Sequence, residues 1–338
     1  MQYIKSTICR WKKTFSFRDS AVSPFFITYN KNMMARRKIL VVGATGQQGQ
    51  ATIAALQSSL TLTGEPAVEV LGLTRSASSP KADALKKRFP NITLVEGDAR
   101  APQPVFDAHP DIRSIFLVTT PPEEESQALP LIDVACSAAS HVDHIVFSSV
   151  DRGGDALSWS TPTPVPHFAA KHRIELHLRD ACRKKSSGGI RWTILRPTGF
   201  MDNYNPGTLG PLMASLWAQG MPAGQKMQLV STHDIGVFAA RALLDPERWD
   251  GKAIGLAGCE MSFEDVKRVF HEVVGKELPM TWTVVAKGVL WWVAEAKTSF
   301  AWFREHGYGA DIEALRKLEP GMQDFRAWLK ESSRWNVQ

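Results

Sequence analysis

The stretch KILVVGATGQQGQ, residues 38–50, decides the fold. It opens with a short apolar run after the lysine, which predicts a buried strand. Gly43, Gly46 and Gly49 follow, and apolar residues then recur at helical spacing over 47–60. A glycine turn between a strand and a helix lets the backbone approach a pyrophosphate, which the N–H groups at the helix N-terminus bind. The stretch therefore predicts a dinucleotide-binding site.

Strands and helices continue to alternate beyond this stretch. Apolar runs predict further strands at 68–74, 92–96, 114–118, 144–148 and 192–195. Helical spacing between them predicts helices at 81–89, 129–140 and 171–185. Repeated strand–helix units with short connections favour a parallel sheet with helices on both faces. We therefore predict an α/β fold in which residues 38–200 form a doubly wound parallel Rossmann sheet that binds a dinucleotide.

The alternation weakens after Pro197, where helical spacing dominates. Helices are expected near 211–219, 233–244 and 262–275. A group of aromatic residues with helical spacing lies further on: Trp282, Trp291, Trp292, Phe300, Trp302 and Phe303. We interpret this stripe as core packing, with a lid over a flat substrate as the alternative. Residues 201–338 are thus expected to form a smaller, mainly helical substrate lobe, with strands that return to the main sheet.

The composition excludes several classes of protein. A length of 338 residues is enough for two domains. The four cysteines are widely spaced and form no CxxC pair, which excludes a disulfide-stapled scaffold. No apolar run is long enough for a membrane span. The GxSxG motif of serine hydrolases is absent, and His141 and His144 border a strand without a neighbouring cysteine, so we expect no bound metal.

The net charge of +6 comes from the N-terminus. Residues 1–38 hold nine Lys and Arg and one Asp, a charge of +8. The other 300 residues hold 31 basic and 33 acidic side chains and sum to −2. A nearly neutral body does not favour a groove for a phosphate backbone. We therefore expect a small-molecule substrate as the partner, and neither a nucleic acid nor a membrane.

Residues 1–37 differ from the rest of the chain. They are basic, poor in acids and contain Ser and Thr, a composition typical of a transit peptide. A disordered tail is the other reading, as is a start codon placed too early, with Met33 or Met34 as the true start. We expect a cytoplasmic location, with a mitochondrial one as the alternative if this basic tail is a targeting segment.

The end of the predicted strand 68–74 indicates which nucleotide binds. NAD-selective sites carry an acid there, whereas this chain reads Leu-Thr-Arg-Ser over 73–76. The guanidinium of Arg75 can pair with a 2′-phosphate, and Lys81 is close enough in sequence to assist. We therefore predict NADP(H) as the cofactor. Asp98 follows the next strand and is either a partner of the adenine amino group or a simple turn residue.

The catalytic tyrosine of typical short-chain dehydrogenases is missing. Those enzymes need a YxxxK pair on the helix after the fifth strand, and none of the four tyrosines has a lysine four residues later. The expected position instead reads His167-Phe-Ala-Ala-Lys171. Three hypotheses remain open. Lys171 binds the cofactor ribose in a silent protein, Lys171 or His167 donates a proton, or both are surface residues.

Two serines end the predicted strand 144–148. Ser148 and Ser149 lie where a substrate carbonyl could accept a hydrogen bond. The alternative is that their hydroxyls satisfy backbone groups at the end of the strand.

The chain resembles the NmrA-like proteins, which are atypical relatives of the short-chain dehydrogenases. The matching segments run in family order over about 300 residues; they are 41–52, 73–75, 96–98, 165–175, 194–203, 232–243 and 255–275. The resemblance implies a Rossmann domain with a small C-terminal lobe and a preference for NADP. It also implies two functional types: redox sensors that bind a dinucleotide and regulate a partner protein, and reductases that act on quinones or phenylpropanoid-like compounds.

The resemblance also implies the roles of individual residues. Around the pyrophosphate it places Gly43, Thr45, Gly46, Gln47, Gln48 and Gly49. Along the rest of the cofactor it places Arg75 at the 2′-phosphate, Asp98 at the adenine, and Thr119 and Thr120 at the adjacent edge. On the nicotinamide side it places Ser149, Lys171 and a loop of Pro197, Thr198, Gly199, Phe200 and Asn203.

These observations predict an NADP(H)-dependent oxidoreductase of the NmrA-like type. The expected substrate is a small carbonyl, quinone or enone, and the resemblance suggests secondary metabolism as a setting. Lys171, with His167 as a second candidate, would supply the proton, and Ser149 would orient the substrate oxygen. The alternative is a catalytically silent NADP(H) sensor that regulates a partner protein.

Overall fold

The computed structural model describes residues 37–63, 68–184 and 189–337. The predicted basic tail lies outside these ranges except for Arg37, which begins the first strand. No helix in the described ranges is long and apolar enough to cross a bilayer.

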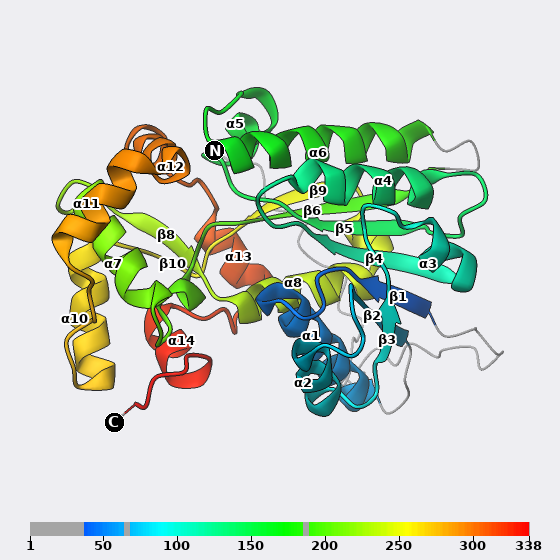
Figure 1. The fold of residues 1–338 in the computed structure, drawn as a ribbon, viewed down its shortest axis with the longest axis horizontal. Helices are drawn as coiled ribbons and strands as arrows, with labels where there is room; N and C mark the ends of the chain where they lie inside the picture. The colour runs from blue at the N-terminus through cyan, green and yellow to red at the C-terminus, as the bar shows by residue number, and fades with distance from the viewer. Residues whose placement is uncertain (1–36, 64–67, 185–188, 338) are drawn as a thin grey trace, which may run out of the picture. The chain divides into compact units, whose positions relative to one another are not determined.

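Seven parallel strands form the main sheet, in the order β3-β2-β1-β4-β5-β6-β9 (Figure 1). They are β1 (Arg37–Val41), β2 (Val68–Thr74), β3 (Thr93–Glu96), β4 (Ile112–Val118), β5 (His144–Ser148), β6 (Arg191–Pro197) and β9 (Lys252–Leu256). The first six strands are those expected from the apolar runs, so the predicted doubly wound parallel sheet is confirmed. The sequence analysis did not locate β9, because only its last residue is fully buried and its apolar pattern is weak.

Helices cover both faces of this sheet. One face carries α1 (Gln47–Thr63), α2 (Pro80–Arg88) and α8 (Thr232–Leu244), and the other carries α3 (Gln103–Ala108), α4 (Glu124–Cys136) and α6 (Pro166–Lys184). Helix α8 comes from the predicted lobe but packs closely on α1. Gly236 makes this contact possible, because a Cβ there would lie 2.4 Å from the backbone of Ala51.

The C-terminal lobe is mainly helical, as predicted, and also contains a small sheet. Strands β7 (Gly199–Phe200), β8 (Met227–Val230) and β10 (Cys259–Met261) pair in the order β10-β8-β7. The longer helices of the lobe are α7 (Leu209–Gly220), α10 (Phe263–Val274), α11 (Thr283–Trp292) and α12 (Ala294–Glu305). The shorter helices of the lobe are η1 (Met201–Tyr204), α9 (Pro246–Trp249), α13 (Ile312–Leu318) and α14 (Phe325–Glu331), and the short α5 (Asp155–Ser160) lies between β5 and α6. Buried aromatic residues such as Trp217 and Trp328 fill the core of the lobe.

Two helices start earlier than predicted. Helix α4 begins at Glu124 rather than near 129, and α6 begins at Pro166 rather than near 171. In α6 the proline occupies the first turn, where its missing N–H costs no hydrogen bond. The earlier starts place Glu124 and His167 in the first turns of helices that begin at the same edge of the sheet.

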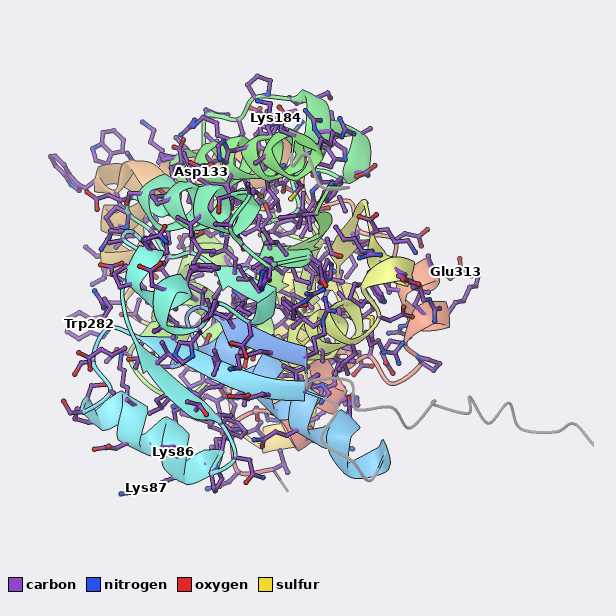
Figure 2. The ribbon with its side chains drawn as sticks, turned by 90° about the vertical axis from the view of Figure 1, so that its right-hand side faces the viewer. Lys86, Lys87, Asp133, Lys184, Trp282 and Glu313 are labelled. Carbon is purple, nitrogen blue, oxygen red and sulfur yellow. The ribbon has the colours of Figure 1, made fainter. Side chains whose placement is uncertain are left out.

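The predicted aromatic stripe is not one surface. The helical conformation is interrupted at Val293, which lies between α11 and α12. Phe300 and Trp302 are buried, as expected of core residues, but Trp282, Trp291 and Trp292 are exposed. Figure 2 shows the side chain of Trp282 at the edge of the molecule. Core packing was therefore the wrong interpretation for these three tryptophans, because the break turns α11 and α12 in different directions.

Candidate functional site

The glycine turn between β1 and α1 has a geometry that only glycine fits. Gly43 has a φ of +73°, in the left-handed region. A Cβ at Gly49 would lie 2.3 Å from the carbonyl oxygen of Gly43, so this glycine lets α1 start close to β1. A Cβ at Gly46 would meet only that same oxygen, at 3.2 Å. The turn is thus a cradle of exposed backbone at a helix N-terminus, which fits the pyrophosphate of a dinucleotide.

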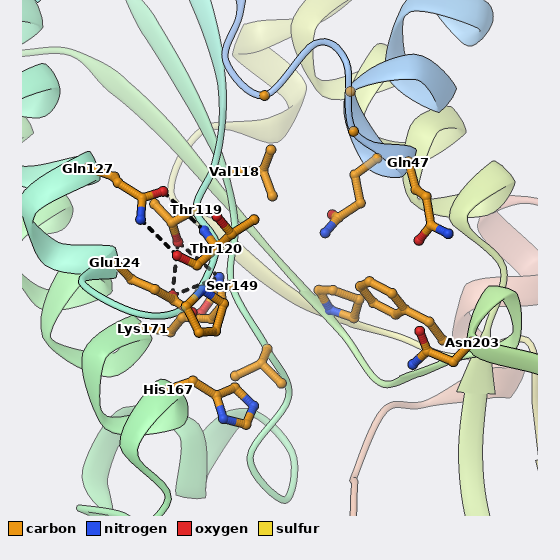
Figure 3. Close-up of a pocket in the computed structure, with 18 of the residues that line it drawn as sticks. Gln47, Val118, Thr119, Thr120, Glu124, Gln127, Ser149, His167, Lys171 and Asn203 are labelled. Atoms are coloured by element: carbon orange, nitrogen blue, oxygen red, sulfur yellow. Dashed lines mark hydrogen bonds and ion pairs between the residues drawn. The ribbon is translucent and has the colours of Figure 1, made fainter. Parts of the chain in front are cut away.

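A pocket of about 1180 Å³ runs along the carboxyl ends of the parallel strands from this turn. Most residues that the sequence assigned to the cofactor or the reaction line it, whereas Ser148 does not and instead donates to Gln48. Those that line the pocket are Gly43, Thr45, Gly46, Gln47, Gln48, Gly49, Arg75, Asp98, Thr119, Thr120, Ser149, His167, Lys171, Pro197, Thr198, Gly199, Phe200 and Asn203. Figure 3 shows Gln47 and Asn203 on one side, facing Thr119, Glu124 and Lys171 on the other.

The end of the pocket beyond β2 is basic. Arg75 and Lys81 both line it, with Ser79 between them. Ser79 caps α2, its hydroxyl accepting a hydrogen bond from the N–H of Ala82 at 3.2 Å. Arg75 is exposed and makes no ion pair with a described residue, so its guanidinium is available to an anionic ligand. This arrangement suits a 2′-phosphate.

Asp98 makes the turn contact, and its role as an adenine partner stays a prediction. Its Oδ1 accepts a hydrogen bond from the N–H of Arg100 at 2.9 Å, which is the turn role. The residue also lines the pocket beside Gly97 and Ala99. Its second oxygen lies 4.0 Å from the Arg100 guanidinium and is the atom that could meet an adenine amino group.

Lys171 lies at the centre of the opposite wall (Figure 3). It projects from α6, and its Nζ lies 3.2 Å from the Thr119 hydroxyl, the carbonyl oxygen of Ser148 and the carboxylate of Glu124. Burial lowers the pKa of Lys171, and the charge of Glu124 opposes that shift. The lysine is therefore held in a fixed position with a pKa below that of a free side chain.

Glu124 is the main residue that the sequence analysis missed. It is buried at the start of α4, and its Oε2 accepts a hydrogen bond from the Thr119 hydroxyl at 2.9 Å. Its Oε1 is buried and has no hydrogen-bond partner among the described residues. A buried carboxylate oxygen without a partner is costly and fits a donor group on a ligand. The only sequence signal was the acidic run PPEEE at 121–125, directly after a strand and a polar turn.

Ser149 lines the pocket, but its hydroxyl is already engaged. It donates to Glu175, a buried carboxylate that also pairs with Arg152 and Arg196, each at 2.8 Å. Burial acts to raise the pKa of Glu175, but the two guanidinium groups outweigh it and hold the pKa below its ordinary value. The hydroxyl proton of Ser149 is thus directed at this ion cluster, and the role of Ser149 in orienting a substrate oxygen stays a prediction.

His167 lies at the first turn of α6 and joins that helix to the C-terminal lobe. Its Nδ1 forms a hydrogen bond with the carboxylate of Glu295 at the start of α12. The described residues include no hydrogen bond between His167 and Lys171. His167 thus connects two walls of the pocket.

Aromatic and apolar side chains of the lobe form the remaining wall. They are Tyr204, Met213, Leu216, Trp217, Met227, Val293, Ala296, Phe300, Phe303 and Tyr308. Of these, the sequence pattern marks only Phe300 and Phe303, by their helical spacing. Tyr204 and Tyr308 have no lysine four residues later and carry no motif, yet both line the pocket, where burial raises the pKa of each phenol.

The described residues include no cluster of three His, Cys, Asp or Glu side chains that could hold a metal ion. Of the two histidines considered above, His144 is buried in β5 and its Nε2 lies 2.9 Å from the Thr193 hydroxyl. Burial lowers the pKa of His144 to about 3. It is a core residue of the sheet.

Comparison with known proteins agrees with this architecture. The model of the NmrA-like family matches residues 35–328. Prestalk A differentiation protein A of Dictyostelium discoideum is 33% identical over 95 residues, which are 27% of this chain and 30% of that protein. The match thus spans under a third of the length of that relative.

Several solved structures share the fold. NmrA, a negative transcriptional regulator solved with NAD, is 20% identical with a TM-score of 0.66, covering 89% of this chain and 96% of its own. The triphenylmethane reductase of Citrobacter sp., complexed with NADP(H), is 17% identical with a TM-score of 0.63, covering 87% and 99%. An NADPH-dependent quinone oxidoreductase from Escherichia coli, complexed with NADPH, is 22% identical with a TM-score of 0.64, covering 86% and 98%.

Identities this low establish the fold and leave the activity open. The family model, in contrast, covers most of the chain, including the glycine turn and the Lys171 helix. On that match the chain belongs to the NmrA-like family.

Proposed function

We propose that the chain is an NADP(H)-dependent oxidoreductase that reduces a small carbonyl, quinone or enone. The observation that carries the proposal is Lys171, a buried lysine in the pocket wall, held against Glu124 where a nicotinamide would lie. Two of the structural neighbours, the triphenylmethane reductase and the quinone oxidoreductase, are reductases solved with NADP(H) or NADPH.

The chain's own residues would hold the cofactor in an extended position. The backbone of the glycine turn would bind the pyrophosphate, and Arg75 and Lys81 would bind the 2′-phosphate. Glu124 Oε1 would accept a hydrogen bond from the ribose or the carboxamide, and this bond would supply the partner that the buried oxygen lacks. When bound, the reduced nicotinamide supplies the hydride for the substrate.

Lys171 would donate the proton from its Nζ to the substrate oxygen. Burial and the contact with Glu124 suit this role, because the ammonium is held in place while its pKa is lowered toward the working pH. The rate should then fall as the pH rises through the pKa of Lys171, which lies below its ordinary 10.5. His167 would keep α12 against the pocket through Glu295 and would not transfer the proton.

Steady-state kinetics of two variants test this assignment. NADPH consumption is followed with a panel of quinones, enones and aldehydes. For Lys171→Met we expect kcat to fall about 10²- to 10⁴-fold, the usual size of a general acid effect, with the NADPH affinity changed only severalfold. His167→Gln is the control and should stay within a few-fold of wild type. Equal losses in both variants would remove Lys171 as the specific proton donor.

A second function, a redox sensor without turnover, is favoured by a different observation. The three N–H groups of Lys171 already face acceptors on Thr119, Ser148 and Glu124, and the Ser149 hydroxyl is bound to Glu175. In the described structure, Lys171 and Ser149 thus have no N–H or O–H left to offer a substrate unless the lysine moves. Selective NADPH binding with no turnover on the whole panel, together with partner binding that depends on the NADPH/NADP ratio, would favour the sensor.

A further inference from the structure

Helix α11 carries its apolar side chains outward. Trp291 and Trp292 are 75% and 84% exposed, and Trp282 at its N-cap is 83% exposed. Val284 is also exposed, whereas Ala286 is the only residue of α11 that is fully buried. A surface helix normally buries its large apolar residues and exposes small and polar ones. We use the name tryptophan face for the exposed side chains of residues 276–297.

Hydrogen bonds and buried contacts attach the tryptophan face to the core of the lobe. The N–H of Thr281, next to Trp282, donates to the Ser215 hydroxyl at 2.9 Å, and that hydroxyl donates to the carbonyl oxygen of Thr281 at 3.1 Å. Ser215 belongs to α7 in the core of the lobe, and Ala286 packs into the same core. The exposed rings are therefore held outward by packed structure beneath them.

The charged side chains of the tryptophan face are mostly positive. Lys276, Lys287 and Lys297 are exposed and make no ion pair with a described residue. Two carboxylates lie in the same segment: Glu277 is exposed, with its Oε1 3.3 Å from Nδ1 of His271, and Glu295 is half-buried and hydrogen-bonded to His167. The exposed side chains of the face thus include three lysines and one glutamate, an excess of positive charge.

We propose that the tryptophan face docks on the surface of a bilayer that contains anionic phospholipid. Tryptophan favours the boundary between lipid headgroups and acyl chains, where its ring is buried and its N–H stays hydrated. Lysine stems lie along apolar surface and bring the ammonium groups to anionic headgroups. The contact is peripheral, and it revises the sequence-based expectation of no membrane partner.

The charges argue against a second copy of the chain as the occupant. Two copies joined through this face would bring six lysine ammonium groups together with only the two exposed carboxylates of Glu277, so like charges would outnumber opposite ones. An anionic bilayer offers the opposite charge across the whole face.

The tryptophan face is continuous with the pocket. Val293, at the break between α11 and α12, is exposed on the face and also lines the pocket. Glu295 and Ala296, the next residues of the pocket wall, follow directly. A docked molecule would therefore present this side of its pocket to the bilayer, where apolar compounds concentrate. Docking itself does not depend on the proposed oxidoreductase activity.

Vesicle flotation of the full chain tests the proposal. The probes are vesicles of phosphatidylcholine alone and of phosphatidylcholine mixed with phosphatidylglycerol. We expect binding to the mixed vesicles, weak binding to the neutral ones, and loss of the difference at about 0.5 M salt, where the Debye length is short. The triple variant Trp282→Ala, Trp291→Ala, Trp292→Ala should bind at least tenfold more weakly.

Two matched variants separate the causes. Leu157→Ala with Leu318→Ala removes exposed apolar side chains elsewhere and should bind like wild type. Lys276→Gln, Lys287→Gln, Lys297→Gln should weaken binding to the mixed vesicles and leave the melting temperature unchanged. Brominated lipid should quench the fluorescence of wild type more than that of the tryptophan variant.

Three outcomes would overturn the proposal. The first is no binding to the mixed vesicles. The second is equal binding by wild type and the tryptophan variant, which would assign the lipid contact to the basic N-terminal residues. The third is a dimer in sedimentation that the tryptophan variant abolishes, which would make a second copy the occupant.

Discussion

The pocket wall at the edge of the sheet is held by backbone geometry and buried charge, whereas the wall from the C-terminal lobe is held by apolar side chains. The sheet edge contains the glycine turn, where a Cβ at Gly49 would strike the backbone, and the cluster of Glu175 with Arg152 and Arg196. The lobe wall contains Trp217, Phe300, Phe303 and similar residues that could be exchanged for others of like size.

This difference indicates which residues of the pocket can be substituted without loss of the fold or of the cofactor site. Changes at the sheet edge leave a clash or an unpaired buried charge, so they should destroy the fold or the cofactor site. Changes in the lobe wall reshape an apolar surface, so they should alter substrate choice and leave cofactor binding intact. The following predictions test this division, from the largest expected effect to the smallest.

Glu175→Gln should lower the free energy of unfolding more than any of the substitutions that follow. It leaves Arg152 and Arg196 buried without their carboxylate, and breaking such a pair typically costs about 3–5 kcal/mol. Denaturant unfolding at neutral pH measures the loss. Glu125→Gln is the matched control, since its partner Arg173 is exposed and such a pair contributes about 0–1 kcal/mol.

The same variant has a defined pH dependence. Because the folded protein holds the pKa of Glu175 below its ordinary value, its contribution is present above that value and is lost as the pH falls through the folded pKa. The gap in stability between wild type and Glu175→Gln should therefore narrow in acid. A gap that stays constant from neutral to acidic pH would contradict a stabilising role for the charge.

Gly49→Ala should have the next largest effect, on both stability and NADPH affinity. Its Cβ would meet the Gly43 oxygen at 2.3 Å, and relieving such overpacking costs about 1–3 kcal/mol. The variant should melt earlier and bind NADPH at least about tenfold more weakly, since 1.4 kcal/mol corresponds to one factor of ten. Gly288→Ala in α11 is the control, because a Cβ there meets nothing within 4 Å. Equal NADPH affinity in both variants would rule out the turn as the pyrophosphate cradle.

Arg75→Ala tests the basic end of the pocket. A hydrogen bond to a charged group contributes about 1.5–3 kcal/mol, so NADPH affinity should fall about tenfold or more. NADH lacks the 2′-phosphate and serves as the internal control, because its affinity should hardly change. A parallel loss for both nucleotides would indicate that Arg75 acts on the fold and not on the phosphate.

Phe303→Leu should have the smallest effect. Phe303 lines the pocket and packs on Phe168 and Tyr308, and losing one aromatic contact costs about 0.5–1.5 kcal/mol. We expect KM for the organic substrate to change severalfold while NADPH affinity stays the same. Phe270→Leu, in the core of the lobe but outside the pocket wall, is the control for general loosening. A change in NADPH affinity for Phe303→Leu alone would break the division between the two walls.

The sheet edge could be predicted because its signals are local. Strands 68–74 and 144–148 were placed at their observed bounds, since apolar runs there are bracketed by turn residues. The glycine turn was found for the same reason. Arg75 and Lys171 were also found locally, one from the end of a strand and the other from the position of a helix.

The lobe residues that line the pocket and the partners of the site residues could not be predicted, because they depend on contacts between distant segments. Glu124 meets Lys171, and Ser149 meets Glu175, only after strands and helices have assembled. Tyr204 and Tyr308 enter the pocket through the fold of the lobe, with no motif around them. The break at Val293, which exposes the tryptophan face, had no glycine or proline to mark it.

The most direct test of the account is amide hydrogen exchange of the chain with and without NADPH. We predict that NADPH slows amide exchange at the glycine turn, residues 43–49, and at residues 75–81 beyond the second strand. Slower exchange confined to other parts of the chain, or no change at a saturating concentration of NADPH, would contradict the assignment of this pocket to the cofactor.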